Sequence, residues 1–179
     1  MRYKWFGTGD IPEQISSAVM SDFFLPVIQH LCRVICHKWF VIVAGWRVGV
    51  PFLTTLVHDL SKVMPPEIIA YTRQFFMDEK DRDEWAYAWL HHQNSNKHHW
   101  NYYIDRGYPD KCLKMPDKYA KEMIADWMAT SRAYSGIWDI TDWLKKNWDK
   151  IRLHEDTRCY VRNVLKRLGY DMSKILSSD

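Results

Sequence analysis

Apolar side chains recur every three or four residues along most of this chain. Such a period puts the apolar side chains on one face of an α-helix, where they can pack against a core. The short runs of alternating polar and apolar residues that indicate a β-sheet are missing. We therefore expect an all-α protein.

Helix caps and helix breakers divide this pattern into segments. Asp22 can cap a long helix that ends near residue 44, and the turn region from Gly45 to Pro51 separates it from a helix over 52–62. Pro66 can open the next helix. The later helices are expected over about 66–77, 85–92, 116–134, 141–150 and 154–168.

The long first helix carries His37 and should bury much of its surface, because apolar residues cover several of its overlapping faces. The residues expected on its inward side are Leu25, Ile28, Leu31, Cys32, Ile35, Trp39 and Ile42.

The apolar stretch from Trp39 to Val57 is long enough to suggest a membrane span. Gly45, Gly49 and Pro51 interrupt it, so we expect two buried helices that meet at a turn and no membrane association.

A chain of 179 residues is large enough to bury a core without disulfides or a structural metal. We expect one domain over residues 1–179. Its core should cover about 22–134, its C-terminal helices about 137–168, and a polar tail 170–179.

The charges point to a small partner rather than a large one. The net charge is +3 and the basic residues are scattered, so the chain has no basic stripe suited to long nucleic acid. A small anionic substrate fits this balance better. The four cysteines are too irregular for a secreted disulfide framework, and no signal-peptide core follows Met1, so we expect a cytoplasmic protein.

Histidines and aspartates occur in an order that can build a metal site. His37 is followed by the adjacent pair His58-Asp59, then by the pairs His91-His92 and His98-His99, and finally by Asp126. Neutral imidazoles and carboxylates suit Mn, Fe, Co, Ni or Zn, and Mg is also compatible. We expect one or two divalent ions, held by side chains from several helices.

This order resembles the HD-domain superfamily of metal-dependent phosphohydrolases, which implies a helical bundle with a metal site between its helices. In that superfamily a single metal uses the set His, His-Asp and Asp, here His37, His58, Asp59 and Asp126. Two-metal members add two histidines between the His-Asp pair and the last Asp. The resemblance implies that Asp59 bridges two metals, and we take His92 and His99 as the added ligands, with His91 and His98 as the alternatives.

The segment His58-Asp59-Leu60-Ser61-Lys62 also resembles the HD-x-x-K variant of this signature. Lys62 lies close enough along the chain to reach a phosphate held beside Asp59, although a cation at a helix end is also common. The motifs over about residues 30–165 resemble a little-characterised family of small phage and bacterial HD-like proteins. If a phage encodes the protein, we expect it in the host cytoplasm.

Other charged residues are weaker candidates. Glu122 lies one helical turn before Asp126 and can act as a general base or orient a ligand. Arg132 and Lys38 are candidate phosphate clamps, and a surface position is the alternative for each. Cys32 and Cys36 stand four residues apart on an apolar face, which favours packing over zinc binding.

Three functions remain open from the sequence. The leading hypothesis is a phosphohydrolase that acts on a nucleotide or another small phosphoester through a metal-activated water, with Asp59, Lys62 and Glu122 as its catalytic residues. The second is a di-iron oxygenase of the HD type. The third is a scaffold that binds a nucleotide or a partner without catalysis. The many aromatic residues fit either a pocket or the seam of a homo-oligomer.

Overall fold

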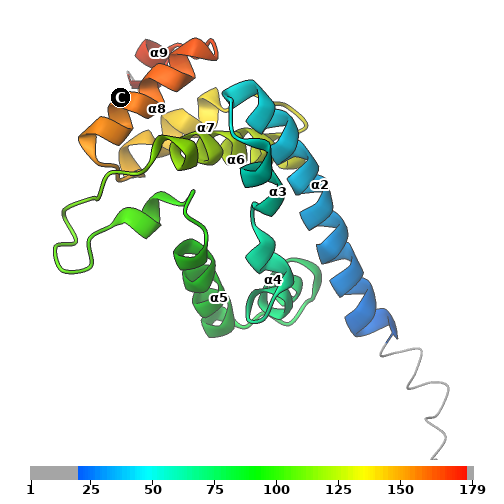
Figure 1. The fold of residues 1–179 in the computed structure, drawn as a ribbon. Helices are drawn as coiled ribbons and strands as arrows, with labels where there is room; N and C mark the ends of the chain where they lie inside the picture. The colour runs from blue at the N-terminus through cyan, green and yellow to red at the C-terminus, as the bar shows by residue number, and fades with distance from the viewer. Residues whose placement is uncertain (1–19, 177–179) are drawn as a thin grey trace, which may run out of the picture.

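A computed structural model describes residues 20–176, and these residues form helices joined by loops (Figure 1). Within that range the chain has no strand, apart from one isolated bridge between Ile104 and Cys112. The all-α prediction is confirmed. The elements in chain order are η1 (Met20–Phe24), α2 (Leu25–Val48), α3 (Phe52–Val57), η2 (Leu60–Val63), α4 (Glu67–Phe76), α5 (Arg82–Ser95), η3 (Trp100–Tyr103), α6 (Asp117–Ser135), α7 (Thr141–Asn147), η4 (Trp148–Lys150), α8 (Glu155–Arg167) and α9 (Met172–Leu176).

Two groups of helices lie toward the two ends of α2 (Figure 1). α6 to α9 lie toward its C-terminal end, and α4 and α5 lie toward its N-terminal half. The larger apolar core joins the C-terminal end of α2 to α6, α7, α8 and α9, and it includes the fully buried side chains of Ile124, Leu144 and Leu165. A smaller cluster between α4 and α5 is formed by Ala70, Tyr71 and Ala88. The candidate site lies between these two clusters.

α2 is longer than predicted, because it continues through Gly45 to Val48. It ends at Gly49, whose backbone has the left-handed φ of 80° that favours glycine at this position. Gly45 is needed for a different reason. A Cβ atom at Gly45 would stand 2.5 Å from Cγ2 of the buried Thr55, so glycine allows α3 to pack directly on the backbone of α2.

The predicted helix over 52–62 is wrong, since α3 ends at Val57 and a separate 3-10 turn, η2, follows. The break falls at His58 and Asp59. Asp59 adopts a left-handed backbone with φ 54° and ψ 29°, which a continuous helix cannot contain.

The predicted polar tail is also corrected, because α9 lies within it and buries Met172 and Ile175.

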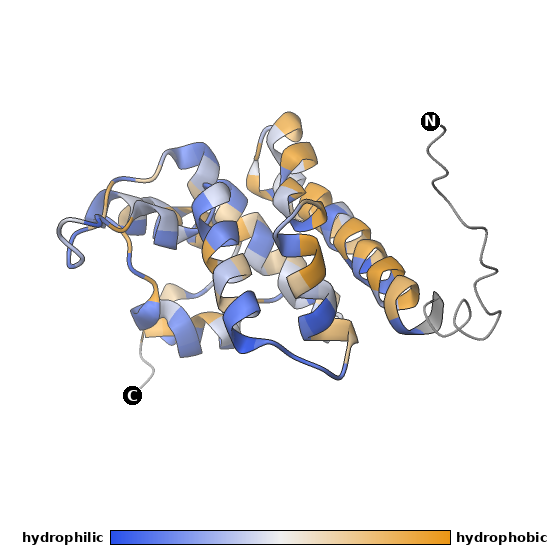
Figure 2. Cartoon of the chain, turned by 90° about the horizontal axis from the view of Figure 1, so that it is seen from below, coloured by the Kyte–Doolittle hydropathy of each residue, from blue (hydrophilic) through white to orange (hydrophobic). Residues whose placement is uncertain are grey.

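The predicted inward face of α2 is wrong as well. Leu25, Ile28, Ile35 and Trp39 are more than half exposed. The side chains that α2 buries lie on the opposite side of the helix and are Pro26, His30, Val34, Val41, Ala44, Gly45 and Val48. His37 shares this buried side. Apolar side chains along α2 therefore face outward, and Figure 2 shows hydrophobic residues along the length of this helix.

The helix from Asp22 to Val48 is long and apolar enough to cross a membrane, by length and composition only. Of the most apolar 18-residue stretch of this helix, 22% is buried inside the molecule. Core helices and signal sequences meet the same criteria.

We expect Gly45→Ala to lower the free energy of unfolding by about 1–3 kcal/mol, because the added methyl group overpacks the contact between α2 and Thr55. Urea unfolding followed by circular dichroism measures this change. Gly107→Ala is the matched control, since a Cβ there meets only the Asp105 side chain at 3.4 Å. Equal stability of the two variants would contradict the packing role of Gly45.

Candidate metal centre

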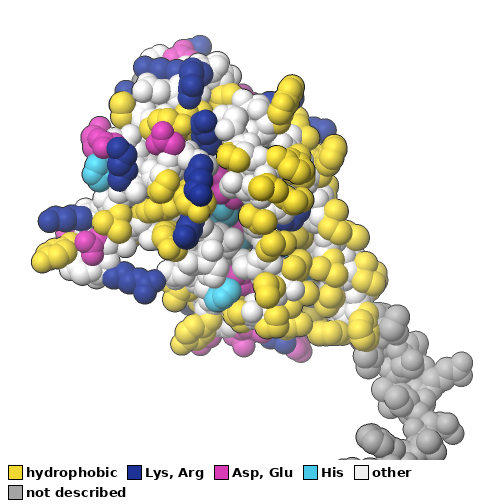
Figure 3. Space-filling model, in the orientation of Figure 1, with side chains coloured by type: hydrophobic (Ala, Val, Ile, Leu, Met, Phe, Trp, Pro, Cys, Tyr) yellow, Lys and Arg dark blue, Asp and Glu magenta, His cyan; other side chains and the backbone are white. Residues whose placement is uncertain are grey.

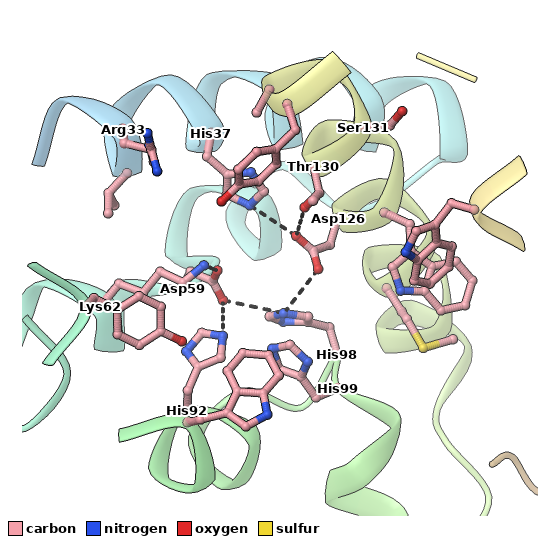
Figure 4. A pocket seen from close by; sticks show the side chains of 18 of the residues that line it. Arg33, His37, Asp59, Lys62, His92, His98, His99, Asp126, Thr130 and Ser131 are labelled. Carbon is pink, nitrogen blue, oxygen red and sulfur yellow. Dashed lines mark hydrogen bonds and ion pairs between the residues drawn. The ribbon is translucent and has the colours of Figure 1, made fainter. Parts of the chain in front are cut away.

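The histidines and aspartates that the sequence singles out converge from separate elements (Figure 4). α2 supplies His37, the break after α3 supplies His58 and Asp59, and α6 supplies Asp126. α5 and the loop after it supply the remaining imidazoles, those of His92, His98 and His99.

Asp59 stands at the centre of this cluster. It is the one non-glycine residue with a positive φ within residues 20–176. Aspartate tolerates the left-handed conformation better than most residues, and such strained positions gather at functional sites. Because the chain turns sharply there, the adjacent side chains of His58 and Asp59 both reach the cluster, 3.4 Å apart between Nε2 and Oδ2.

The first candidate group of ligands combines His37, His58, Asp59 and Asp126, with one donor atom from each lying within 4.8 Å of all the others. Asp126 Oδ1 is 3.1 Å from His37 Nε2 and 3.5 Å from His58 Nε2. This is the four-residue set that the sequence predicted.

The second candidate group combines Asp59 with His92, His98 and His99, again with donor atoms within 4.8 Å of one another. Nε2 of His92 and Nε2 of His98 lie 3.5 and 3.4 Å from Oδ1 of Asp59. The selection of His92 and His99 alone was incomplete, because the structure brings His98 into the group beside both of them.

Asp59 belongs to both groups, and its two oxygens face different sets of imidazoles. Oδ2 is the oxygen nearest His58, whereas Oδ1 is the one nearest His92 and His98. A carboxylate in this position can bridge two metal ions, one bound at each oxygen.

Five buried ligand atoms of the cluster make no hydrogen bond. They are Nε2 of His37, His58, His98 and His99, and Oδ1 of Asp59. A buried polar atom without a partner costs about 1–3 kcal/mol, so five such atoms in one place call for an explanation. Metal ions bound to these atoms would supply the missing partners, and the donor set of imidazole nitrogens and carboxylate oxygens suits transition metals.

Buried glutamates hold the other nitrogen of two of these histidines. Glu122 Oε1 accepts a hydrogen bond from Nδ1 of His58 at 2.9 Å and lies 3.5 Å from Nδ1 of His98. A proton on Nδ1 leaves Nε2 free to face the cluster, which is the usual arrangement of a metal-binding histidine. Glu122 itself does not line the cavity described below, so it can orient ligands but is not placed to act as a general base.

Glu67 orients a histidine of the second group in the same way, through a hydrogen bond from Nδ1 of His92. Its carboxylate is fully buried, with Oε2 2.8 Å from Nδ1 of His92 and Oε1 2.7 Å from Nδ1 of His91. His91 is 42% exposed and contributes to neither candidate group, so it supports the glutamate instead. Glu67 was visible in the sequence only as an acidic residue at a helix start.

The charged groups of the cluster shift one another's pKa values. Burial alone would raise the pKa of Asp59, but the charges of His58 and Lys62 outweigh it and hold the pKa well below its usual range. Burial opposes protonation of His58, yet the carboxylates around it, led by Asp59, raise its pKa to about 10. Burial and the charges of His98 and His92 lower the pKa of His99 to about 2. Metal binding at His58 would therefore release a proton.

A cavity of about 1230 Å³ opens beside the cluster. This is larger than the roughly 300–1,000 Å³ of most small-molecule sites. Its wall includes His37, Asp59, His92 and Asp126. Many aromatic rings complete the wall, including those of Tyr71, Phe75, Trp85, Trp89, Trp100, Trp127, Tyr134 and Trp143.

Lys62 and Arg33 are among the cations that line this cavity, and Lys62 lies against a carboxylate of the cluster. Lys62 Nζ is 2.6 Å from Oδ2 of Asp59, and the side chain is 19% exposed. Arg33, on α2, also lines the cavity, with its guanidinium 4.5 Å from the ring centre of Phe76 (Figure 4). Arg33 was not predicted from the sequence as a cavity residue, because it lies between two apolar faces of a helix and belongs to no motif.

The other two candidate phosphate clamps lie outside the cavity wall. Arg132 stacks on the rings of Phe40 and Trp138. Lys38 donates hydrogen bonds to the carbonyl oxygens of Leu56 at 2.8 Å and His58 at 2.6 Å. These contacts leave neither cation placed to bind a ligand at the cluster.

The fold and the donor atoms define an all-α protein with a candidate centre for two metal ions. The chain belongs to a family of unknown function (DUF5662), whose match covers residues 27–167. No curated protein and no solved structure matches the chain significantly.

We expect Lys38→Met to lower the free energy of unfolding by about 1–3 kcal/mol, because it leaves two carbonyl oxygens at the end of α3 without their donor. Chemical denaturation gives this value. Lys80→Met, at an exposed position, controls for the loss of one positive charge. A loss of stability no greater than that of the control would show that Lys38 does not hold the segment that carries His58.

Proposed function

We propose that this protein is a hydrolase that uses two divalent metal ions to cleave a small phosphoester, with a nucleotide as the favoured substrate class. One observation carries the proposal: two groups of buried donor atoms share the carboxylate of Asp59. The order of these donors along the chain also resembles that of two-metal HD-domain proteins. Membership of that superfamily is part of the proposal.

Seven side chains would hold the metal ions. His37, His58, Asp59 and Asp126 would form one site. Asp59, with His92, His98 and His99, would form the other. Bound metal ions would polarise the phosphoryl group and lower the pKa of a bound water, which becomes the nucleophile.

The protein supplies an electrostatic balance that favours an anion. Two divalent ions carry four positive charges, and the carboxylates of Asp59, Glu67, Glu122 and Asp126 carry four negative ones. Lys62, whose ammonium lies 2.6 Å from Asp59, adds one positive charge and so leaves the region with a net positive charge. Burial lowers the pKa of Lys62, but Asp59 and Asp126 outweigh it and raise the pKa, so the cation persists at neutral pH. Charge developing on a phosphoryl oxygen would be stabilised by this cation.

The cavity wall suits an organic group attached to the phosphate. Its aromatic rings can stack on a flat base, and Arg33 offers a second cation at a distance from the carboxylates. The Tyr71 hydroxyl is buried at this wall without a hydrogen-bond partner. It is therefore available to a polar atom of the substrate.

A di-iron oxygenase is the second candidate, and the nitrogen content of the centre favours it. Five imidazoles and two carboxylates make up the two groups, and imidazoles bind iron well. Iron in the purified protein together with substrate-dependent oxygen uptake would favour this function over hydrolysis.

We expect about two equivalents of transition metal in the wild-type protein by elemental mass spectrometry, and almost none in Asp59→Asn, because that change weakens both sites. His37→Ala and His92→Ala should each retain about one equivalent, since each removes a ligand of one group only. Asp110→Asn, at an exposed position, is the control for a lost carboxylate. Equal losses in His37→Ala and His92→Ala, with no metal left in either, would contradict two separable sites.

We expect the metal-loaded protein to release phosphate from at least one member of a panel of nucleotides and simple phosphoesters. Lys62→Met should lower kcat/KM for that substrate by about 10-fold or more, because a charge-assisted hydrogen bond to the phosphate is lost. Lys62→Arg should recover part of the activity. Measuring the metal content of each variant checks that both metal sites remain occupied. Full metal occupancy with no turnover of any phosphoester would contradict the hydrolase and favour a binding scaffold.

A further inference from the structure

The outward side of α2 carries a regular apolar stripe. We define the α2 stripe as Leu25, Ile28, Cys32, Ile35, Trp39, Ile42 and Trp46. Successive members are three or four residues apart in strict alternation over three heptads, which is the spacing of a coiled-coil seam. All members are exposed except Ile42, which is partly buried.

The stripe is opposite the side of α2 that serves the metal centre. His30, Val34, His37, Val41, Ala44 and Val48 repeat the same spacing two residues later along the chain. At about 100° per residue, a shift of two residues turns the helix to its other side. One side of α2 is therefore covered by the rest of the molecule, and the other has no cover within residues 20–176.

The exposed area matches what a stable interface needs. Ile35 is 69% exposed, Trp39 62% and Trp46 85%. With Leu25 and Ile28, these side chains leave on the order of 700 Å² of apolar surface in water, close to the roughly 800 Å² that each partner contributes to a standard interface. Figure 3 shows hydrophobic side chains gathered along the flank of the molecule where α2 runs. The adjacent helix α3 also exposes Phe52, Leu53, Leu56 and Val57.

The charges around the stripe favour a second copy of this chain over a lipid surface. The cations of α2 turn back onto their own molecule: Arg33 to Phe76, Lys38 to the carbonyl of His58, and Arg47 to the ring of Trp138. A helix that lies on a membrane keeps such cations free beside its apolar face for lipid headgroups. The seven-residue period of the stripe is the spacing of helices that pack together as a coiled coil.

We propose that the α2 stripe is the interface of a homodimer, in which α2 of one protomer packs against α2 of its partner around a two-fold axis. An uncharged stripe can face its own copy without repulsion between like charges, and two-fold dimers are the commonest closed assemblies. Ile35 lies at the middle of the stripe, so it meets its own copy near the axis whether the helices run parallel or antiparallel. This inference does not depend on the proposed reaction.

Light scattering coupled to size-exclusion chromatography tests the dimer. The full-length protein should have twice the 21.5 kDa mass of the chain. Ile35→Glu should raise the dimer dissociation constant at least about 100-fold, because it buries two facing carboxylates in an apolar seam. Tyr87→Glu, on the exposed face of α5, is the control and should remain dimeric. A monomeric wild-type protein at 100 μM, or a dimer unaffected by Ile35→Glu, would overturn the proposal.

Cross-linking tests directly which residues meet across the interface. The four native cysteines are changed to alanine, which keeps position 32 of the α2 stripe apolar, and Ile35 is changed to cysteine, so that mild oxidation should join two chains at residue 35. A cysteine at Tyr87 in the same background should stay unlinked. Absence of the linked product, or a monomer that sediments with neutral or anionic lipid vesicles, would overturn the dimer, and the second result would assign the stripe to a membrane.

Discussion

The burial of negative charge between two helical clusters is the constraint on which this structure depends. Asp59, Glu67 and Glu122 are almost fully removed from solvent. Isolated carboxylates would be very costly there, so each must face a compensating group. Imidazoles and Lys62 provide part of that compensation, and bound metal ions would provide the rest. Four helices meet this need together: α2 and α6 carry His37 and Asp126 in their middle turns, and α3 and α5 end beside the cluster.

Asp59 connects the local backbone to this electrostatic demand. A continuous helix would point His58 and Asp59 about 100° apart, whereas the left-handed turn brings both to the cluster. Lys38 holds the carbonyl of His58, and the neighbouring residue on α2, His37, enters the first group of ligands. Two adjacent residues of one helix therefore fix the segment and complete the site.

The sequence predicted most of the helices, the four residues of the first candidate group, and His92 and His99 of the second, because 3.6-residue periods and the order of histidines and aspartates are visible without coordinates. It did not reveal the orientation of α2. Two stripes with the same spacing run along that helix, and hydrophobicity favoured the larger side chains of Ile35 and Trp39, although the buried stripe contains His30 and His37. Glu122 was a candidate for orienting a ligand, but the sequence did not show that its partner is His58, 64 residues away. The contact between Glu67 and His92, 25 residues apart, was also not predicted, because it depends on tertiary packing.

Anomalous diffraction from crystals grown with manganese would locate the two metal ions that Asp59 is proposed to bridge. We expect two anomalous peaks about 3.5–4 Å apart, one on each side of the Asp59 carboxylate. His37 and Asp126 should lie beside one peak, and His92 and His98 beside the other. A single peak, or two peaks that share no ligand at Asp59, would contradict the account.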